Sequence, residues 1–483
     1  MRLPAILSVL ASAVVLLAAS QAQAADSVYW ADFEGGQITH AGMSGGGGDN
    51  LDVSGADADE ANGLAIDAAA GKAYWVTGSG KVFYANLSGG GGGQLNTGGP
   101  SGDFLLGAAV DPLGGRLYWV DGSEGRIAWA NLNGSGGGFL DTSGATVEGP
   151  TGVAVDHAAG RVYWSNSGLG VPKVSYANLG GGGGGDVPNT GATGAADGLA
   201  LDAAAGRVYW ADYGADKISY AALDGSGTGD VNTAGATVDG PFGVAVDPIA
   251  GRIYWANEQG GKISYANLNG SGAADLDTTG GSLALPAFPV LLETPAAAGA
   301  PQAAGGSAPG STLTCTPGTW APDLLESFLN RAPQATSLQW LQDGRPIPGA
   351  TSPTYTAAAV GNYSCQSLAA NQAGSASQTS ATVSIFSLAK KAKLNRKKAT
   401  ALLAAHIPGP GTLTLTGKHL ITQTKTSEAP TPTTIKLPIK AKGKAKKALN
   451  RKGKAKIRAT ITFKPTTGSA GSQQKMLVLK KAS

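Results

Sequence analysis

Histidine and cysteine are scarce in this chain of 483 residues, which contains four histidines and two cysteines. The sequence has no paired-histidine metal motif. Charged residues make up 14% of the chain, and beyond residue 24 no apolar run is long enough to span a bilayer. These shortages speak against the familiar hydrolase motifs and against a transmembrane segment in the mature protein.

The first 24 residues have the pattern of a secretory signal peptide. Arg2 is followed by an apolar stretch from Leu3 to Ala19 and by the small-residue sequence Ala22-Gln-Ala24, so cleavage is predicted before Ala25. The C-terminal residues 479–483 carry no anchor that we recognise. We therefore expect an exported protein that is secreted and associated with the cell surface.

A Tyr-Trp pair recurs six times between residues 25 and 293, at intervals of 44 to 46 residues. The pairs are Tyr29-Trp30, Tyr74-Trp75, Tyr118-Trp119, Tyr163-Trp164, Tyr209-Trp210 and Tyr254-Trp255. A period of 40 to 50 residues is typical of four-stranded units that stack on copies of themselves in a ring. The spacing predicts a six-bladed β-propeller over 25–293, with the pairs packed between blades rather than exposed for ligand stacking.

The innermost strand of each unit is predicted from a second recurring segment, of the type Gly243–Asp247. This segment occurs five times against six Tyr-Trp pairs, so one inner strand is missing. The apolar stretch from Phe288 to Leu292 follows the last repeat and is predicted to supply it. Closing the ring in this way would remove the exposed edges of an open sheet.

These repeats resemble the class B repeat of the low-density lipoprotein receptor, the YWTD six-bladed propeller. The motif is present as Tyr29–Asp32, Tyr118–Asp121 and Tyr209–Asp212, whereas Thr77, Asn166 and Asn257 occupy its last position in the other copies. The resemblance implies the propeller fold and extracellular protein or glycan partners. It does not identify the partner, because the framework motif does not specify the recognition surface.

Residues 294–386 resemble an immunoglobulin-like domain. Export favours pairing of the two cysteines, Cys315 and Cys365, in a disulfide. Trp340 lies midway between them and Tyr363 lies two residues before the second, as in that sandwich. Ala359 occupies a position where such domains often have aspartate.

Residues 387–483 contain 23 lysines or arginines and one acidic residue, whereas residues 25–293 contain 29 acidic and 10 basic residues. Five strand-like segments predict a small basic β-sandwich: 399–406, 412–416, 434–439, 457–463 and 476–479. Pro408–Gly411 is read as a hairpin between the first two, and the lysine-rich sequence from residue 440 as a connection.

This basic module is predicted to bind a polyanion, most plausibly an anionic polymer of the cell envelope. The proposed binding residues are Lys440, Lys442, Lys444, Lys446, Lys447, Arg451, Lys452, Lys454 and Lys456. Nucleic acid is disfavoured because the module lacks aromatic stacking platforms. A solvated basic surface, or docking onto the chain's own acidic propeller, remains the alternative.

Acidic residues recur near the start of the predicted inner strands. Asp59, Asp103, Glu148 and Asp239 each lie four residues before the opening glycine, and Asp197 lies close to this position. They are predicted to form a partial ring at the channel mouth that holds calcium or a basic segment; the alternative is that they cap turns. A second row is read as a structural acid–base pair across a turn: Asp67, Asp111, Asp156, Asp202 and Asp247, each five residues before a lysine or arginine.

Catalysis would require one blade to carry groups that its neighbours lack. His40 and His157 are the histidines of the predicted propeller, and neither has an evident nucleophile beside it in the sequence. The chain is therefore interpreted as an all-β, exported, surface-associated, non-catalytic binding or scaffold protein that requires no cofactor. The alternatives are a metal-dependent hydrolase or lyase on the propeller, or a purely structural cell-wall component.

Overall fold

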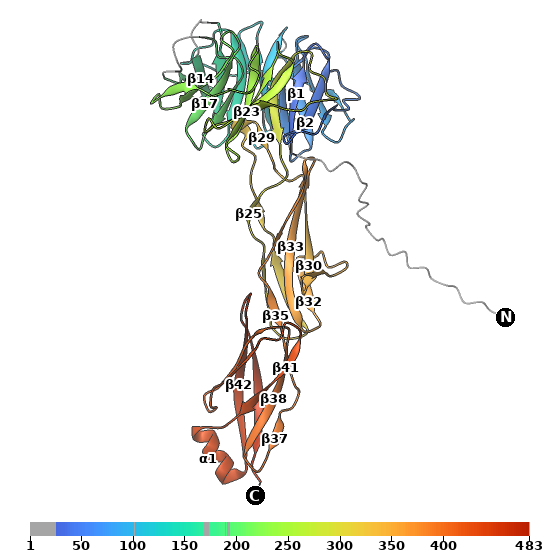
Figure 1. Ribbon diagram of the computed structural model, residues 1–483, viewed down its shortest axis with the longest axis vertical. Helices are drawn as coiled ribbons and strands as arrows, with labels where there is room; N and C mark the ends of the chain where they lie inside the picture. The colour runs from blue at the N-terminus through green and yellow to red at the C-terminus, as the bar shows by residue number, and fades with distance from the viewer. Residues whose placement is uncertain (1–25, 101, 169–172, 189, 191–193, 483) are drawn as a thin grey trace, which may run out of the picture.

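The computed structural model describes residues 26–100, 102–168, 173–188, 190 and 194–482. The predicted signal peptide lies outside the described residues. Figure 1 shows an elongated, nearly all-β molecule with a propeller at one end, a middle domain and a basic domain at the other end. In this part of the chain no helix is long and apolar enough to cross a membrane.

The propeller contains, within the described residues, six sheets arranged as blades, and five of them are built from four consecutive strands. The first strand of each contacts the first strands of its neighbours and is therefore the innermost. The strands of these five blades are β4 (Ala61–Asp67), β5 (Lys72–Thr77), β6 (Val82–Asn86), β7 (Gly93–Gln94), β8 (Leu105–Asp111), β9 (Arg116–Asp121), β10 (Arg126–Asn131), β11 (Gly137–Phe139), β12 (Pro150–Asp156), β13 (Arg161–Asn166), β14 (Lys173–Asn178), β15 (Gly185–Asp186), β16 (Leu199–Asp202), β17 (Arg207–Asp212), β18 (Lys217–Ala222), β19 (Thr228–Asp230), β20 (Pro241–Asp247), β21 (Arg252–Asn257), β22 (Lys262–Asn267) and β23 (Ala273–Asp275).

The sixth blade joins the two ends of the propeller sequence. Its inner strand is β24 (Pro286–Leu292), which pairs antiparallel with β1 (Ser27–Asp32). The outer strands of this blade are β2 (Gln37–Gly42) and β3 (Gly48–Asn50). The predicted closure of the ring by the apolar stretch after the last repeat is therefore confirmed.

All six Tyr-Trp pairs lie in the second strand of a blade, and each of the six tryptophans is at most 2% exposed. The indole N–H groups of Trp75, Trp164 and Trp255 each donate to a backbone carbonyl 18 residues earlier, at 2.8 to 2.9 Å. A buried indole needs such an acceptor. The pairs therefore belong to the core, as predicted.

The glycines that open the inner strands form the narrowest ring of the channel. A Cβ placed on Gly198 would lie 2.3 Å from the Cα of Gly243, and one on Gly243 would lie 2.7 Å from the Cα of Phe288. Gly63, Gly107 and Gly152 are equally close to the next inner strand. Phe288 occupies the sixth position, and its ring lies within 3.0 Å of Cβ positions built on Gly107 and Gly198. The ring therefore blocks the channel.

The second row of aspartates caps the turns that end the inner strands. Each carboxylate accepts a hydrogen bond from the backbone N–H three residues later, as in Asp67 to Ala70. The basic residues are their register partners, but among the described residues no salt bridge joins a pair. They lie instead over aromatic rings of the third strand, as Arg161 lies over Tyr176. The expected pair is thus correct in register, but its two side chains make separate contacts.

The middle domain places two sheets around a core that contains the disulfide between Cys315 and Cys365. The predicted disulfide is confirmed, while assignment to the immunoglobulin-like fold stays a prediction. Trp340 is fully buried in this core, and the Tyr363 hydroxyl donates to the Ala359 carbonyl. The strands are β25 (Ala297–Gly299), β26 (Gln302–Gly305), β27 (Ser311–Thr316), β28 (Thr319–Trp320), β30 (Ala335–Gln342), β31 (Arg345–Pro346), β32 (Thr354–Ala357), β33 (Gly361–Asn371), β34 (Gly374–Thr379) and β35 (Val383–Ile385).

A segment of the middle domain, residues 321–332, inserts into the base of the propeller. It contains the 3-10 helix η1 (Leu325–Ser327) and β29 (Leu329–Asn330), which pairs in parallel with β24. The Ser327 hydroxyl donates to the Leu201 carbonyl of β16, and Leu329 is fully buried in the propeller core. The propeller core therefore extends beyond the predicted boundary at 293/294, because this base plug (residues 321–332) packs in the propeller core and not in that of the middle domain.

Carboxyl groups crowd this junction. Burial, together with the nearby Asp156 and Asp202 carboxylates, raises the pKa of Glu326 to about 7. Burial and the neighbouring Asp247 raise the pKa of Glu293 to about 8. Because raised carboxyl pKa values mean that the charged forms are disfavoured, the junction is more stable when these groups are protonated.

The basic domain has two four-stranded sheets around one core. The predicted hairpin at Pro408–Gly411 is wrong: the strands on either side of it lie in different sheets, and the segment crosses between them. Gln473 donates to the Ser307 carbonyl and so joins this domain to the middle domain. The strands are β36 (Ser387–Leu388), β37 (Lys393–Asn395), β38 (Thr400–Ile407), β41 (Thr433–Ile439), β39 (Gly411–Thr416), β40 (Gln423–Ser427), β42 (Lys454–Pro465) and β43 (Gly471–Lys480).

The lysine-rich connection contains the helix α1 (Gly443–Lys452), which the sequence analysis did not predict. Ala445 and Leu449 are one turn apart and bury one side of the helix against the core. Gly453 ends the helix with a left-handed backbone, and its N–H donates to the Leu449 carbonyl. The basic side chains cover the remaining surface of α1.

Candidate functional site

A pocket of about 550 Å³ lies at the propeller face opposite the middle domain. The inner strands begin at this face and end at the base, where their last aspartates lie near the plug. Five lining residues each precede a glycine of the channel ring: Asn62, Leu106, Thr151, Asp197 and Phe242. Four more directly follow the Tyr-Trp motif: Phe33, Ser167, Tyr213 and Glu258. Two repeated positions therefore build most of this channel pocket.

Aromatic rings form much of the pocket wall. Phe242 lies edge-on to Phe288, with ring centroids 5.1 Å apart, so the residue that blocks the channel also supports this wall. Tyr213 packs edge-on against Phe242 at 6.0 Å. Phe33 and Phe104 complete the aromatic lining. The pocket is therefore closed below and open to solvent above.

Phe104 occupies a strained backbone position. Its φ is +63° and its side chain is 50% exposed. The same position in three other blades is occupied by Glu60, Gly149 and Gly240, at φ +56°, +58° and +56°. The left-handed conformation is therefore a feature of the repeat, which glycine adopts without strain and phenylalanine or glutamate only at a cost.

Two carboxyl groups face the pocket. Asp197 is 5% exposed and accepts the Tyr213 backbone N–H at 3.1 Å. Burial raises the pKa of Asp197 to about 6, with smaller contributions from Asp212 and Glu258. Burial also raises the pKa of Glu258, against a lowering by the hydrogen bond with the Tyr213 side chain. Both carboxylates therefore lie where their negative charge is poorly compensated.

Asn62 contributes an unpaired acceptor. Its side chain is 5% exposed and lines the pocket, and within the described residues its Oδ1 atom has no hydrogen-bond partner. A buried polar atom without a partner costs on the order of 1 to 3 kcal/mol. Such an atom is expected to be satisfied by a bound donor.

The predicted acidic ring is only partly assembled. Asp197 lines the channel pocket, whereas Asp59, Asp103, Glu148 and Asp239 are exposed on the loops around it. Asp59 lines a separate depression together with Glu34, Glu60 and Lys81. In the described part of the chain, no three acidic, histidine or cysteine side chains are grouped so as to hold a metal ion. The cation or ligand site proposed at these residues therefore stays a prediction.

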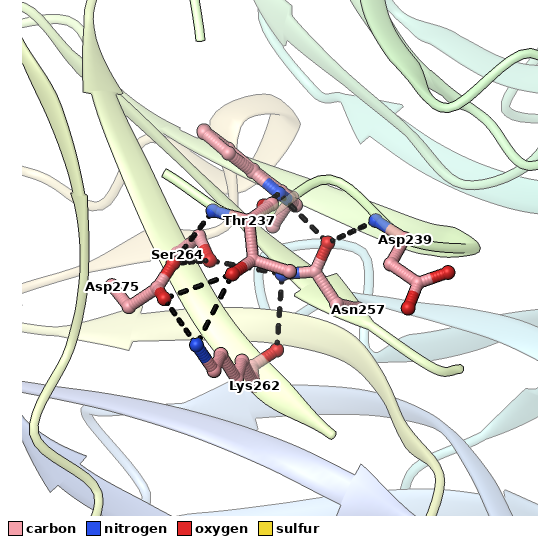
Figure 2. Close-up of polar contacts among 7 residues, drawn as sticks. Thr237, Asp239, Asn257, Lys262, Ser264 and Asp275 are labelled. Atoms are coloured by element: carbon pink, nitrogen blue, oxygen red, sulfur yellow. Dashed lines mark hydrogen bonds and ion pairs between the residues drawn. The ribbon is translucent and has the colours of Figure 1, made fainter. Parts of the chain in front are cut away.

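A framework of hydrogen bonds explains why these loops are regular. Figure 2 shows that Asn257, at the last position of the Tyr-Trp motif, accepts the Asp239 backbone N–H at 3.0 Å and donates to Ser264 at 2.9 Å. Asn166 holds Glu148 in the same way in another blade. The motif position therefore fixes the backbone of the acidic residue and leaves the acidic side chain free.

Asp275 anchors the outer part of the same network (Figure 2). Its carboxylate lies 2.6 Å from the Lys262 ammonium and accepts from Ser264 and from both the backbone and hydroxyl of Thr237. Burial would raise the pKa of Asp275, but these hydrogen bonds outweigh it and lower the pKa to about 2. This carboxylate is therefore structural.

Neither propeller histidine lines the channel pocket. The His157 Nδ1 lies 2.9 Å from the Asp111 carboxylate, at the turn that follows β12. His40 lies in β2, the third strand of its blade, and its ring packs on that of Tyr29 in the neighbouring β1, with ring centroids 4.8 Å apart.

Most of the pocket was not predicted from the sequence. The predicted acidic residues lie four residues before each ring glycine, whereas the side chains that enter the channel lie one residue before it. The residues that were not predicted include Phe33, Asn62, Phe104, Tyr213, Phe242 and Glu258. A usable signal was present, because four of the six phenylalanines in 25–293 line this pocket or block the channel beneath it.

The basic domain presents the proposed polyanion-binding residues on its surface. All nine are exposed. Lys444, Lys447 and Arg451 lie on one side of α1 at the far end of the molecule (Figure 1). Lys454 and Lys480 are directly opposite each other on β42 and β43. Like charges at such positions repel each other, so a bound anion would stabilise the surface.

Residues 115–157 match the family described as low-density lipoprotein receptor repeat class B. The match lies within the propeller. It extends from β9 to the end of β12 and includes Tyr118–Asp121, which confirms the resemblance that the motif carries.

Two solved structures are similar to the chain. One comes from a crystal structure of a nidogen–laminin complex; the match covers 55% of this chain and 98% of that chain, at 19% identity and a TM-score of 0.46. The other is TolB from Acinetobacter baumannii, where the match covers 55% of this chain and 66% of that chain, at 15% identity and a TM-score of 0.42. No curated protein matches the chain in sequence.

Replacing Phe104 with glycine is expected to change the free energy of unfolding by less than about 1 kcal/mol, because relief of the left-handed strain offsets the lost contacts and the added chain entropy. Phe83 is buried in another blade, and Phe83→Ala is expected to cost about 3 to 5 kcal/mol. Urea unfolding of both variants measures the difference. An equally large loss for both would show that Phe104 serves the core.

Proposed function

We propose that the chain is an exported, surface-associated, non-catalytic binding protein, in which the channel pocket recognises a partner and the basic domain associates with an anionic envelope polymer. The observation that carries this proposal is the placement of two unlike surfaces at opposite ends of the molecule. A closed-bottom aromatic pocket lies on the propeller, and exposed lysines and arginines lie on the basic domain. Figure 1 shows these two domains at opposite ends of the molecule. Both surfaces can therefore be occupied at once.

The disulfide and the class B repeat support an extracellular location. The elongated shape argues against docking of the basic domain on its own propeller, because the middle domain separates them (Figure 1). The charge of the basic domain is then available to another molecule. Lysines without aromatic neighbours bind polyanions through counterion release and without sequence recognition.

Reversing three charges on α1, in a variant with Lys444→Glu, Lys447→Glu and Arg451→Glu, is expected to lower retention on purified bacterial envelope by about tenfold or more. The slope of log K against the logarithm of the salt concentration should become shallower by about one for each lost anion contact. Co-sedimentation of the mature full chain over a salt series measures both quantities. The matched control reverses Lys390, Lys391 and Lys398, which are exposed elsewhere on the same domain. Equal losses of retention for the two variants would mean that binding depends on the net charge of the domain and not on α1. Unchanged retention of the α1 variant would contradict the proposal.

An acid–base enzyme is the second candidate, because paired carboxyl groups with raised pKa values in a cleft are typical of catalytic sites. Asp197 and Glu258 are such a pair. Turnover of a bound ligand that Asp197→Asn abolishes would favour this reading. Capture of a partner without turnover favours the binding protein, and capture of nothing by the propeller favours a structural wall component.

A further inference from the structure

The polar lining of the channel pocket offers acceptors without free donors. Asp197 and Glu258 present carboxylates, and Asn62 presents its unpaired Oδ1. The nearby hydroxyl groups are already engaged: Ser167 donates to the Gly149 carbonyl, and Thr151 to the Ala196 carbonyl. Lysine, arginine and histidine are absent from the described residues that line the pocket. A ligand that fits this lining brings its own donors and a positive charge.

The apolar lining limits the rest of the ligand. The rings of Phe33, Phe104, Tyr213 and Phe242 surround the acceptors, and a cation near aromatic faces is attracted by their quadrupoles. The floor is blocked by Phe288, so a ligand enters from the exposed face. A volume of about 550 Å³ suits a long side chain and its neighbours, not a folded domain.

We propose that the channel pocket binds a lysine or arginine side chain of a partner polypeptide, with the charged head at Asp197, Glu258 and Asn62 and the apolar stem against the aromatic wall. This inference rests on the proposed function, because it names what the recognition face takes. The positive charge of the bound side chain would compensate the carboxylates of Asp197 and Glu258, and its N–H groups would donate to the unpaired Asn62 Oδ1. Both interactions are strengthened because the site is partly desolvated.

A polypeptide fits the surroundings better than a free amine does. Phe104 is half exposed at the pocket rim and is positioned to contact residues that flank the inserted side chain. The exposed Asp59, Asp103, Glu148 and Asp239 on the surrounding loops add negative charge where flanking basic residues would pass. Such rim charges raise association rates and select basic partners.

The test compares three probes against the mature full chain by titration calorimetry. The first is the blocked peptide Ac-Leu-Lys-Leu-amide, the second is the same peptide with norleucine, which keeps the four-carbon stem without the ammonium group, and the third is free pentylamine. The lysine peptide is expected to bind at least tenfold more tightly than the norleucine peptide. Equal affinity of the two peptides, or binding of neither, overturns the inference. Tighter binding of pentylamine than of the lysine peptide shows that the site serves small amines.

Variants separate the charged head from the stem. Asp197→Asn and Glu258→Gln are each expected to weaken the lysine peptide about tenfold and to leave the norleucine peptide unchanged, while Phe104→Gly weakens both. Asp224→Asn, in the exposed turn between β18 and β19 and outside the pocket, is the matched control and should have no more than a twofold effect. An equal loss for Asp224→Asn and Asp197→Asn would show general charge attraction instead of a site.

The affinity is expected to fall as the pH is lowered through about 6, because protonation of Asp197 removes its charge. The groups that influence this carboxyl are Asp212, Glu258 and the Tyr213 backbone N–H, and Glu34 acts on Glu258. Binding of the cation should accordingly release protons near this pH, which calorimetry in two buffers of different ionisation enthalpy detects. If no peptide binds in the calorimetry, the proposal that the basic domain binds the envelope is unaffected, because the co-sedimentation experiment on α1 uses no pocket ligand.

Discussion

Deleting residues 286–293 is expected to abolish the soluble, cooperatively folding protein. This segment is the inner strand of the sixth blade, and it also pairs with the base plug, so its loss removes two sheet partners at once. Val290, Leu291 and Leu292 are fully buried, and without them the apolar faces of β1 and β20 are exposed to solvent. An opened ring presents unpaired strand edges, which favour aggregation. Size-exclusion chromatography and thermal unfolding of the mature deletion variant measure the outcome.

A point substitution tests the same closure without shortening the chain. Leu291→Asp places a carboxylate in a fully buried position and is expected to destabilise the propeller by several kcal/mol. Ile249→Asp is the matched control, because Ile249 is an exposed residue of a blade turn, and its effect should stay within about 0.5 kcal/mol. A monomeric deletion variant with an unchanged melting transition would contradict the closure.

The propeller was predictable because its constraints repeat within the chain. Each Tyr-Trp pair reports the same buried position in a second strand, so six copies provide six observations of one local environment. The missing inner strand followed from counting five copies of a segment against six pairs. Closure then required an apolar stretch at the end of the repeats, and Phe288–Leu292 was available.

The base plug could not be predicted from its sequence. Residues 321–332 have neither strand alternation nor helical periodicity. Phe328 and Leu329 pack in the propeller core, but two apolar residues in a loop do not indicate which domain they contact. Other contacts use backbone groups and a hydroxyl, such as the bond from Ser327 to the Leu201 carbonyl. Contacts made by backbone groups do not depend on residue type and therefore cannot be predicted from the sequence. The helix α1 was not predicted for a different reason. Its many lysines suggested a charged connection, although the spacing of Ala445 and Leu449 fits a helix and Gly453 is a typical helix C-terminus.

The channel pocket could be predicted from the sequence only in part. Its walls occupy two fixed positions of the repeat, but the residue types differ from blade to blade, as with Asn62, Asp197 and Phe242 before successive glycines. The repeat fixes where these side chains are, and their variation carries the recognition. The regular acidic positions were more conspicuous in the sequence, yet the structure exposes most of them on loops held by the framework of Asn166 and Asn257.

Removal of the disulfide is expected to destabilise the middle domain by about 4 kcal/mol. The bond between Cys315 and Cys365 closes a loop of 50 residues, and loop-closure entropy of that length in the unfolded chain corresponds to this value. The double variant Cys315→Ala with Cys365→Ala removes the bond without leaving a free thiol. Its melting transition, compared with that of the parent protein, measures the loss.

The consequence should extend into the propeller, because the base plug lies within the loop that the disulfide closes. Leu291 and Glu293 donate backbone hydrogen bonds to the plug carbonyls of Phe328 and Asn330. In the double variant these two N–H groups are expected to exchange with solvent faster, whereas N–H groups in β9, which pairs with β8 and β10 and not with the plug, should keep their protection. Reductant added to the double variant should cause no further change. Unchanged exchange at Leu291 and Glu293 would show that the plug is held by the propeller alone, and that the disulfide stabilises only the domain that contains it.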